Sequence, residues 1–447
     1  MIEFLTLFLG IVAGPQDVAL MVEETVASVE LRLDGELLAV AQEAPWKLEV
    51  DLGTRLLPRE LEAVALDGEG QVVATARQFL NIPRPTAEVS LALSQGANGH
   101  HQANIAWEST SGVRPAEMIA LLDDNEVPIL DGDRVDLRGV DTMQLHVLQV
   151  ELWFPDMTSA RGHLVFGGEY VDETNAELTA FPVSLGRGSP KPAEMSSWFV
   201  ADAQPVQAVA VEKGLANLVI VRSPGVAHWI GSLEGRPEST PTGMSGAIGP
   251  IPFRAEASTA DRQRMALQFQ GDYRVRIVVP RALRETGQRV DFDLFSVSPE
   301  LRSRHGGIYW ALSQEVLVGG AASRTRVSDA VTLAGLQAAG SNHRRTVLLV
   351  LGEAWEDHSR FDVATVRAYL EALNVPVVVW RLGDDSTVGS EWGEAAQISD
   401  YGDLKRAWRS LEKSLQRQRV IWLEGLHLPN AVKIAQSAGV EPVVGRP

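Results

Sequence analysis

Few residue groups in this chain have the types and spacing that catalysis or metal binding would need. Residues 243–247 read Gly-Met-Ser-Gly-Ala, one residue short of the turn that exposes a nucleophilic serine, and they lie in a Gly/Ser/Thr/Pro-rich stretch. His100-His101 follows Asn98-Gly99 with no further metal ligand at useful spacing. The acidic turns 123–125 and 131–133 lack the spacing and the terminal Glu of a helix–loop–helix calcium site. A weak Ca²⁺ site between strands stays an alternative to a charged turn.

Composition removes several other chemistries. The 447 residues include no Cys, which excludes disulfides, thiolate-bound zinc, iron–sulfur clusters and thiol nucleophiles. No phosphate-binding glycine loop with Lys-Ser/Thr and no dinucleotide fingerprint occurs. We therefore expect a chain that is not an enzyme and that uses no cofactor.

The net charge of −18 is unevenly distributed. Residues 1–186 contain ten Lys and Arg against thirty Asp and Glu, a net charge of −20, whereas residues 187–447 have a net charge of +2. Solubility alone explains an acidic surface, but such a surface also repels nucleic acid and attracts cationic partners. We expect a protein partner and no nucleic acid.

The first 17 residues allow two interpretations. Residues 4–14 are apolar and have the length of a signal-peptide core, but Glu3 precedes them and no Lys or Arg does. The alternative is a first β-strand or a disordered start. A run of about 11 residues is too short to span a bilayer, which takes about 20. The expected location, periplasmic or secreted, rests on this segment.

Two acidic β-sandwiches are predicted, over residues 18–86 and 87–186. Apolar and polar side chains alternate in short runs, and Asp34-Gly35 joins two of them as a tight hairpin turn. Further strand-like runs include Val89–Leu93, Met118–Leu122, Leu145–Leu152 and His163–Phe166. Strands at this spacing are typical of Ig-like sandwiches. Residues 187–213 are interpreted as a linker.

Residues 214–425 change to an α/β pattern. Short apolar runs at 218–221, 346–351, 375–380 and 420–423 alternate with amphipathic helical segments. Runs that are apolar throughout are typical of strands covered on both faces. This pattern predicts a doubly wound, mostly parallel sheet, followed by an extension over residues 426–447.

This order of elements resembles a von Willebrand factor type A domain, in particular those of secreted acidobacterial proteins with N-terminal Ig-like modules. The resemblance rests on Thr325 ahead of Asp329-Ala330-Val331, and on the ending from Leu411 to Leu423. The predicted fold class is therefore multidomain: two all-β Ig-like sandwiches followed by an α/β doubly wound domain of this type.

The resemblance implies a degenerate metal-ion-dependent adhesion site. The family places carboxylates where this chain has Val221 and Leu351, while Ser223 and Thr325 match hydroxyl positions and Gly225 replaces a serine. Hydroxyls without a carboxylate bind a hard divalent cation poorly. We therefore expect no metal. Glu353 or Asp357 as a replacement ligand stays an alternative.

The resemblance and the composition together predict a metal-independent module for protein–protein interaction or structural assembly. We expect the binding surface at the carboxyl ends of the strands. Its candidate residues are Ser223, Gly225, Thr325, Glu353 and Trp355. The alternatives are a cation-dependent adhesion receptor, or an accessory subunit of a larger enzyme or surface complex.

Overall fold

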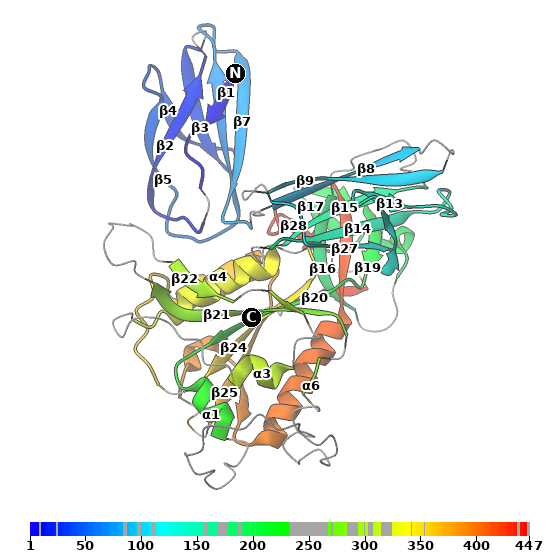
Figure 1. The fold of residues 1–447 in the computed structure, drawn as a ribbon. Helices are drawn as coiled ribbons and strands as arrows, with labels where there is room; N and C mark the ends of the chain where they lie inside the picture. The colour runs from blue at the N-terminus through cyan, green and yellow to red at the C-terminus, as the bar shows by residue number, and fades with distance from the viewer. Residues whose placement is uncertain are drawn as a thin grey trace.

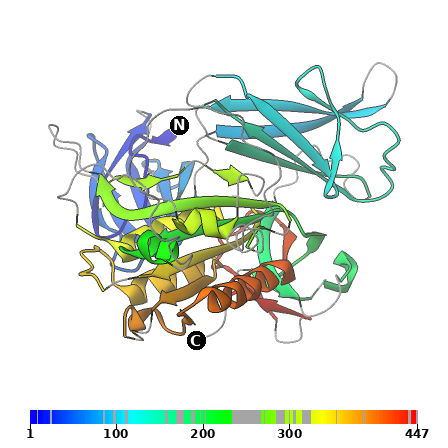
Figure 2. The ribbon, with the colours of Figure 1, turned by 60° about the horizontal axis from the view of Figure 1, so that its bottom comes forward.

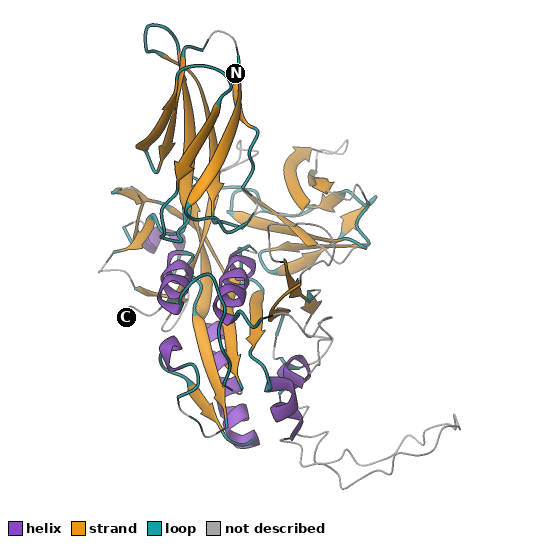
Figure 3. Ribbon diagram, turned by 90° about the vertical axis from the view of Figure 1, so that its left-hand side faces the viewer, coloured by secondary structure: helices purple, strands orange, loops and turns teal. Residues whose placement is uncertain are grey.

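The computed structural model consists mainly of β-sheets, with helices gathered around one of them (Figure 1, Figure 3). It describes residues 1–8, 10–23, 26–83, 87–95, 100–109, 113–155, 159–168, 178–185, 190–195, 197–201, 203–232, 267–269, 271–283, 294–298, 300–302, 307–313, 324–340, 342–352, 354–383, 385, 387–435 and 439–444. No helix among these residues is both long and apolar enough to cross a membrane.

The first unit is a β-sandwich, as predicted. One sheet has the order β1-β2-β5 and the other β4-β3-β6-β7, both antiparallel. The strands are β1 (Ile2–Phe4), β2 (Pro15–Val22), β3 (Ser28–Leu33), β4 (Glu36–Ala41), β5 (Lys47–Asp51), β6 (Arg59–Leu66) and β7 (Val72–Leu80). The hairpin predicted at Asp34-Gly35 is confirmed: β3 pairs with β4, and both turn residues have positive φ, 52° and 82°.

The start of the chain belongs to this sandwich. Strand β1 pairs with β2, and Ile2 and Phe8 are buried in the sandwich core. Residues 2–4 therefore form a strand of the sandwich, whereas the described residues from Leu5 to Gly14 lie outside strands.

The second unit is also a sandwich, and the four strand-like runs predicted for it lie within or overlap its strands. Its sheets have the orders β11-β10-β14-β15 and β12-β13-β9-β8. The strands are β8 (Ala87–Gln95), β9 (His101–Ser109), β10 (Glu117–Leu122), β11 (Asn125–Val127), β12 (Ile129–Leu130), β13 (Arg134–Asp136), β14 (His146–Trp153) and β15 (Ser159–Phe166).

A third antiparallel body combines segments that are far apart in sequence. One sheet has the order β19-β27-β16-β29 and the other β18-β17-β28. Its strands are β16 (Leu178–Leu185), β17 (Phe199–Ala201), β18 (Gln204–Val206), β19 (Ala208–Glu212), β27 (Gln418–Glu424), β28 (Val432–Ile434) and β29 (Val440–Pro442), with the 3₁₀ helix η1 (Pro192–Met195). The stretches interpreted as a linker and as an extension therefore contain strands of a folded body.

The seventh sheet is mixed. Strands β21, β20, β24, β25 and β26 pair in parallel, and β22 and β23 add antiparallel to β21. Helices α4 and α5 pack on one face, and α1, α3 and α6 on the other. The elements are β20 (Ala216–Arg222), α1 (Val226–Ser232), β21 (Tyr273–Leu283), β22 (Leu294–Val297), β23 (Leu301–Arg302), α3 (Ile308–Ser313), α4 (Val327–Ala339), β24 (Arg344–Leu351), α5 (Val363–Ala372), β25 (Val377–Leu382), η3 (Ser390–Trp392), β26 (Ala396–Ile398) and α6 (Tyr401–Arg417).

The predicted fold class is wrong in its second part. Within the described parts of the chain, six of the seven sheets are wholly antiparallel, and only a few helices accompany the strands. The run 420–423, expected as the last parallel strand, lies in β27, which pairs antiparallel with β16 and β19 in another sheet. Residues 214–425 therefore do not form a separate doubly wound domain, and the chain is a predominantly β multidomain protein.

The first sandwich is held against the helices α4 and α5. Leu56 is 1% exposed and packs in the hydrophobic cluster of these helices. The Tyr369 hydroxyl donates to the carbonyl of Asn81 at 2.8 Å, and the Arg360 guanidinium donates to the carbonyl of Ala13 at 3.1 Å. Both apolar and polar contacts thus fix this unit.

Candidate functional site

Two loops at the carboxyl ends of β20 and β24 pack directly on one another. The Ser223 hydroxyl accepts a hydrogen bond from the Gly352 amide at 2.7 Å, and the Ser223 amide donates to the Val350 carbonyl at 2.9 Å. A Cβ atom on Gly352 would lie 2.6 Å from the carbonyl oxygen of Pro224. Ser223 is 4% exposed. Its hydroxyl therefore joins two loops of the protein.

Gly225 has a role in the backbone. Its φ of 82° lies in the left-handed region that favours glycine. Its carbonyl accepts a hydrogen bond from the Trp229 amide at 2.9 Å, within the first turn of α1. The structure thus brings Ser223 and Gly225 against Gly352 at the carboxyl ends of β20 and β24.

The other predicted residues lie around the loop before α5. Thr325 is half-buried, and its carbonyl accepts from the His358 amide at 2.9 Å. Trp355 is half-buried against the cluster of α4 and α5, and its indole N–H is buried without an acceptor among the described residues. These contacts favour packing over an exposed docking role for Trp355. Glu353 lies outside the described residues.

Two carboxylates attach this loop to the first turn of α4. Asp357 accepts from the amides of Val327 and Ser328 at 3.0 and 3.1 Å and from the Ser328 hydroxyl at 2.8 Å. It also accepts from the amide and hydroxyl of Ser359. A carboxylate has about four lone-pair sites, so these five donors occupy Asp357. Asp329 likewise accepts from the amides of Arg360 and Phe361.

The interpretation of Val221 and Leu351 as lost metal ligands is wrong. Both side chains have 0% exposure and belong to the core beneath α4 and α5. They point into the protein and fill its core, as apolar residues of a two-sided sheet do. Among the described residues, no group of three or more His, Asp or Glu is placed to hold a metal ion.

We expect Mg²⁺, Mn²⁺ and Ca²⁺ to give no saturable heat in titration calorimetry, and a chelator to leave the melting temperature unchanged. The reason is that the oxygens of Ser223 and Asp357 already bond to protein donors. A micromolar site that disappears in Asp357→Asn, but not in the exposed control Asp131→Asn, would contradict this expectation.

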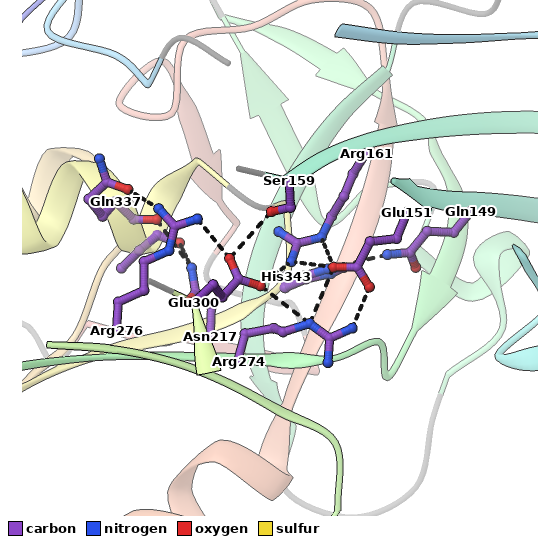
Figure 4. A network of polar contacts seen from close by, with 11 residues as sticks. Gln149, Glu151, Ser159, Arg161, Asn217, Arg274, Arg276, Glu300, Gln337 and His343 are labelled. Atoms are coloured by element: carbon purple, nitrogen blue, oxygen red, sulfur yellow. Dashed lines mark hydrogen bonds and ion pairs between the residues drawn. The ribbon is translucent and has the colours of Figure 1, made fainter. Parts of the chain in front are cut away.

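The most concentrated polar site lies between the second sandwich and the mixed sheet (Figure 4). Five charged side chains form it: Glu151 and Arg161 from the sandwich, Arg274 and Arg276 from β21, and Glu300 next to β23. We call these five residues the charged junction. Exposure of the two glutamates is 4% and 3%, so their charges are almost completely removed from water.

Glu151 connects the sandwich to β21. It lies opposite Arg161 in the pairing of β14 with β15, and Arg161 Nη2 approaches its Oε1 at 2.8 Å. Arg274 pairs with both Glu151 oxygens, with Nε 3.2 Å from Oε1. The Arg274 guanidinium also lies 5.3 Å from the ring centre of Trp153, a cation–π distance.

Glu300 closes the junction from the other side. Its Oε1 is 2.8 Å from Arg161 Nη2, and its Oε2 is 2.8 Å from Arg276 Nη2. Arg276 in turn donates to the side-chain oxygen of Gln337 on α4. The ion pairs therefore run from the second sandwich to β21, and the hydrogen bond of Arg276 continues them to helix α4.

Electrostatics keep the junction charged. Burial raises the pKa of Glu151, but Arg161 and Arg274 outweigh this effect and lower the pKa to about 2. Burial lowers the pKa of Arg161, whereas Glu151 and Glu300 raise it above its ordinary value. Three arginines against two glutamates compensate both buried carboxylates, which is the condition for burying such charges.

Two buried histidines border the charged junction. The side-chain nitrogen of Gln149 lies 3.2 Å from His343 Nε2. The ring of His163 packs on Trp422 with centroids 4.6 Å apart, and its Nε2 is buried without a partner among the described residues. Trp422 donates its indole N–H to Glu212 at 2.9 Å. This side of the interface is aromatic and mostly uncharged.

We expect the folded protein to lose stability as the pH falls below 6.5. Burial lowers the pKa of His163 to about 3 and that of His343 well below its usual 6.5, so both stay neutral when folded and gain a proton when unfolded. Glu212 opposes this effect, because burial raises its pKa to about 7. As the pH falls, its carboxylate gains a proton in the folded state, and the cost of burying its charge disappears. Two histidines against one glutamate leave a net loss that approaches roughly 1.4 kcal/mol per pH unit below about pH 6, where all three groups are largely protonated in one of the two states.

Urea unfolding at pH 7.5 and 5.5 measures this slope. His343→Gln should flatten it, whereas His100→Gln, at an exposed position, should not. Equal unfolding free energies at both pH values in the wild type would show that the histidines do not control stability.

The charged junction was not recognised from the sequence. The sequence feature that could have indicated it is a pair of polar positions on β14, Gln149 and Glu151. In the pairing of β14 with β15 they lie opposite His163 and Arg161. Such alternation usually marks the solvent side of a sheet.

Comparisons with known proteins find fold likenesses only. No family model matches the chain, and no curated protein matches it. Among solved structures, fibronectin(III)-like modules of Clostridium thermocellum CbhA share 16% identity, with 18% of this chain and 93% of that chain covered and a TM-score of 0.17. Proximal thread matrix protein 1 of the mussel byssus shares 10% identity over 51% of this chain and about half of its own length, with a TM-score of 0.28. A beta-glycosidase from Bacteroides vulgatus shares 13% identity over 37% of this chain and 24% of its own length, with a TM-score of 0.20.

These scores are too low to argue for an activity or a partner. The predicted resemblance to a von Willebrand factor type A domain is wrong: no family model supports it, and the antiparallel sheets dominate the fold. The implied degenerate adhesion site is withdrawn with it.

Proposed function

We propose that this chain is a non-enzymatic, metal-independent structural component, which presents its sandwiches and mixed sheet in a fixed arrangement for assembly with other proteins. The observation that supports this most is the charged junction, with Glu151 bonded to Arg161 in its own sandwich and to Arg274 across the interface. An assembly component needs defined geometry between its units.

Buried ion pairs favour geometry over stability. A buried pair gains little over apolar packing, because desolvation offsets most of the Coulomb attraction. It does penalise any displaced arrangement, since each shift would leave a charge buried without its partner. The exposure of 4% or less at both glutamates supports a fixed interface.

The contacts of Asp357 weigh against the alternative of a cation-dependent receptor. Its oxygens cap α4 and bind Ser359, so they are occupied. The extracytoplasmic location also remains a proposal, which fractionation of the producing cells tests.

The test of this function compares partner capture by the wild type with capture by Arg274→Met, after chemical cross-linking and mass spectrometry. We expect the wild type to capture its partners even in the presence of a chelator. Arg274→Met should lose these partners, although its circular dichroism spectrum still shows folded sandwiches. The matched control, Arg138→Met, removes an exposed arginine paired with Asp136 and should keep them. Partners that are kept by Arg274→Met, or lost on chelation, would refute the proposal.

A further inference from the structure

The exposed face of helix α6 carries a row of positive charges. Arg409, Lys413 and Arg417 are exposed and follow each other at four-residue spacing. No ion pair to any of the three exists among the described residues, whereas Arg406 on the same helix pairs with Asp403. We call these three residues the basic stripe.

Helix stability does not explain the basic stripe. Like charges four residues apart destabilise a helix by a few tenths of a kcal/mol per pair. The helix dipole favours a cation in the last turn, which accounts for Arg417 but not for Arg409 or Lys413. The stripe is also unusual in a chain whose net charge is −18.

The first sandwich has a face of the opposite charge. On the outer side of the sheet β1-β2-β5, the side chains of Glu3, Asp17, Glu49 and Asp51 are exposed, with Lys47 as the one cation of β5. Asp17 lies directly opposite Glu49 in the pairing of β2 with β5, an arrangement that destabilises a sheet. No ion pair to these four carboxylates exists within the described parts of the chain. We call them the acidic face.

The two surfaces have matching repeats. Four residues of α-helix advance about 6 Å, so the charges of the basic stripe are about 6 Å apart. Two residues of a strand advance about 6.7 Å, which is the spacing of Glu49 and Asp51 along β5. A helix lying along β5 can therefore place two successive cations opposite Glu49 and Asp51, while the next exposed position of the strand is Lys47.

One molecule cannot join its own two surfaces. The acidic face lies on the sandwich at one end of the molecule, and α6 lies at the other end (Figure 1, Figure 2). A contact between them must involve two chains and is head-to-tail. Such contacts propagate into rings or filaments.

We infer that the basic stripe of one chain docks on the acidic face of a second copy, giving a salt-sensitive head-to-tail assembly. Charge complementarity selects this occupant, because residues 1–186, with a net charge of −20, supply the matching surface. The inference rests on the assembly role proposed above in one respect, because it names a second copy of the chain as the partner in that role.

Sedimentation velocity of the full chain at 20 mM and 500 mM NaCl tests it. We expect concentration-dependent association at low salt that disappears at high salt, where the screening length is only a few ångströms. The variants R409E/K413E/R417E and D17K/E49K/D51K should each associate at least about tenfold more weakly than the wild type. Each variant alone carries two surfaces of the same sign, which repel each other. In the mixture, the acidic surfaces of R409E/K413E/R417E meet the basic surfaces of D17K/E49K/D51K. The mixture should therefore associate where neither variant does alone.

The control R55E/R138E/R367E changes the net charge equally at exposed arginines elsewhere and should still associate. A wild type that stays monomeric at 20 mM NaCl, association that survives R409E/K413E/R417E, or a control that loses association equally would each overturn the inference. If the protein binds a polyanion such as heparin through the basic stripe but does not self-associate, then a second copy of the chain is not the partner of this surface. None of these results changes the partner-capture outcome for Arg274→Met, so the two proposals fail separately.

Discussion

Replacing Arg274 by Met should lower the free energy of unfolding by about 3–5 kcal/mol, the usual cost of removing one partner from a buried ion pair. Arg274 pairs with both oxygens of Glu151 and contacts Glu300 at 3.3 Å. Met keeps much of the side-chain volume beside Trp153, so the loss would report mainly on charge. Urea unfolding followed by tryptophan fluorescence and circular dichroism measures the change.

Two further variants make this result specific. Arg138→Met breaks the exposed pair with Asp136 and should change the unfolding free energy by no more than about 0.5 kcal/mol. The double variant E151Q/R274M removes the carboxylate that loses Arg274, while Arg161 and Arg276 keep Glu300 as their partner, and it should recover part of the loss. If Arg274→Met unfolds within 1 kcal/mol of the wild type, the charged junction does not hold the units together.

Phe8→Ala should destabilise the first sandwich by about 3–5 kcal/mol, as large-to-small changes of buried aromatic residues do. Phe8 is 8% exposed within the sandwich core, and its amide donates to the Gln78 side chain at 3.4 Å. Deletion of residues 1–9 should cost more, because it also removes Ile2 and the pairing of β1 with β2. Thermal unfolding followed by calorimetry measures both.

The neighbouring leucines are the matched controls. Leu5 and Leu7 are 62% and 58% exposed, so Leu5→Ala and Leu7→Ala should leave the melting temperature nearly unchanged. A deletion of residues 1–9 with unchanged melting would show that this segment is dispensable, as a cleaved leader would be.

The sandwiches could be predicted because their signals are local. Alternation along β3 and β6 places apolar residues on one face, and the Asp34-Gly35 turn fixes the hairpin register. Neither feature depends on distant parts of the chain. The helices α4, α5 and α6 were predicted for the same reason, since each has an apolar face at helical spacing.

Strand partners could not be predicted in the second half. The apolar run in β27 suits a parallel or an antiparallel sheet equally, because its side chains are buried in both. Only its pairing with β16, more than two hundred residues away, determines its sheet. Interpreting that run as the end of a known family's sheet produced the wrong fold class and the wrong metal-site interpretation.

The charged junction was missed because its residues look solvent-exposed in sequence. Gln149 and Glu151 alternate with apolar residues on β14, yet both are buried. The mixed sheet covers the face of β14 that the alternating pattern predicts to be exposed to water. Only the matching Arg161 on β15 indicated that this polar face pairs internally.

Distance measurement by pulsed electron paramagnetic resonance tests the fixed arrangement most directly. The chain has no Cys, so spin labels on Met143→Cys, 81% exposed in the second sandwich, and Glu371→Cys, exposed on α5, would be the only ones present. At 500 mM NaCl, we expect one narrow distance distribution in the wild-type background and a broad one in Arg274→Met. A broad or multiple distribution in the wild-type background would contradict a rigid junction between these units.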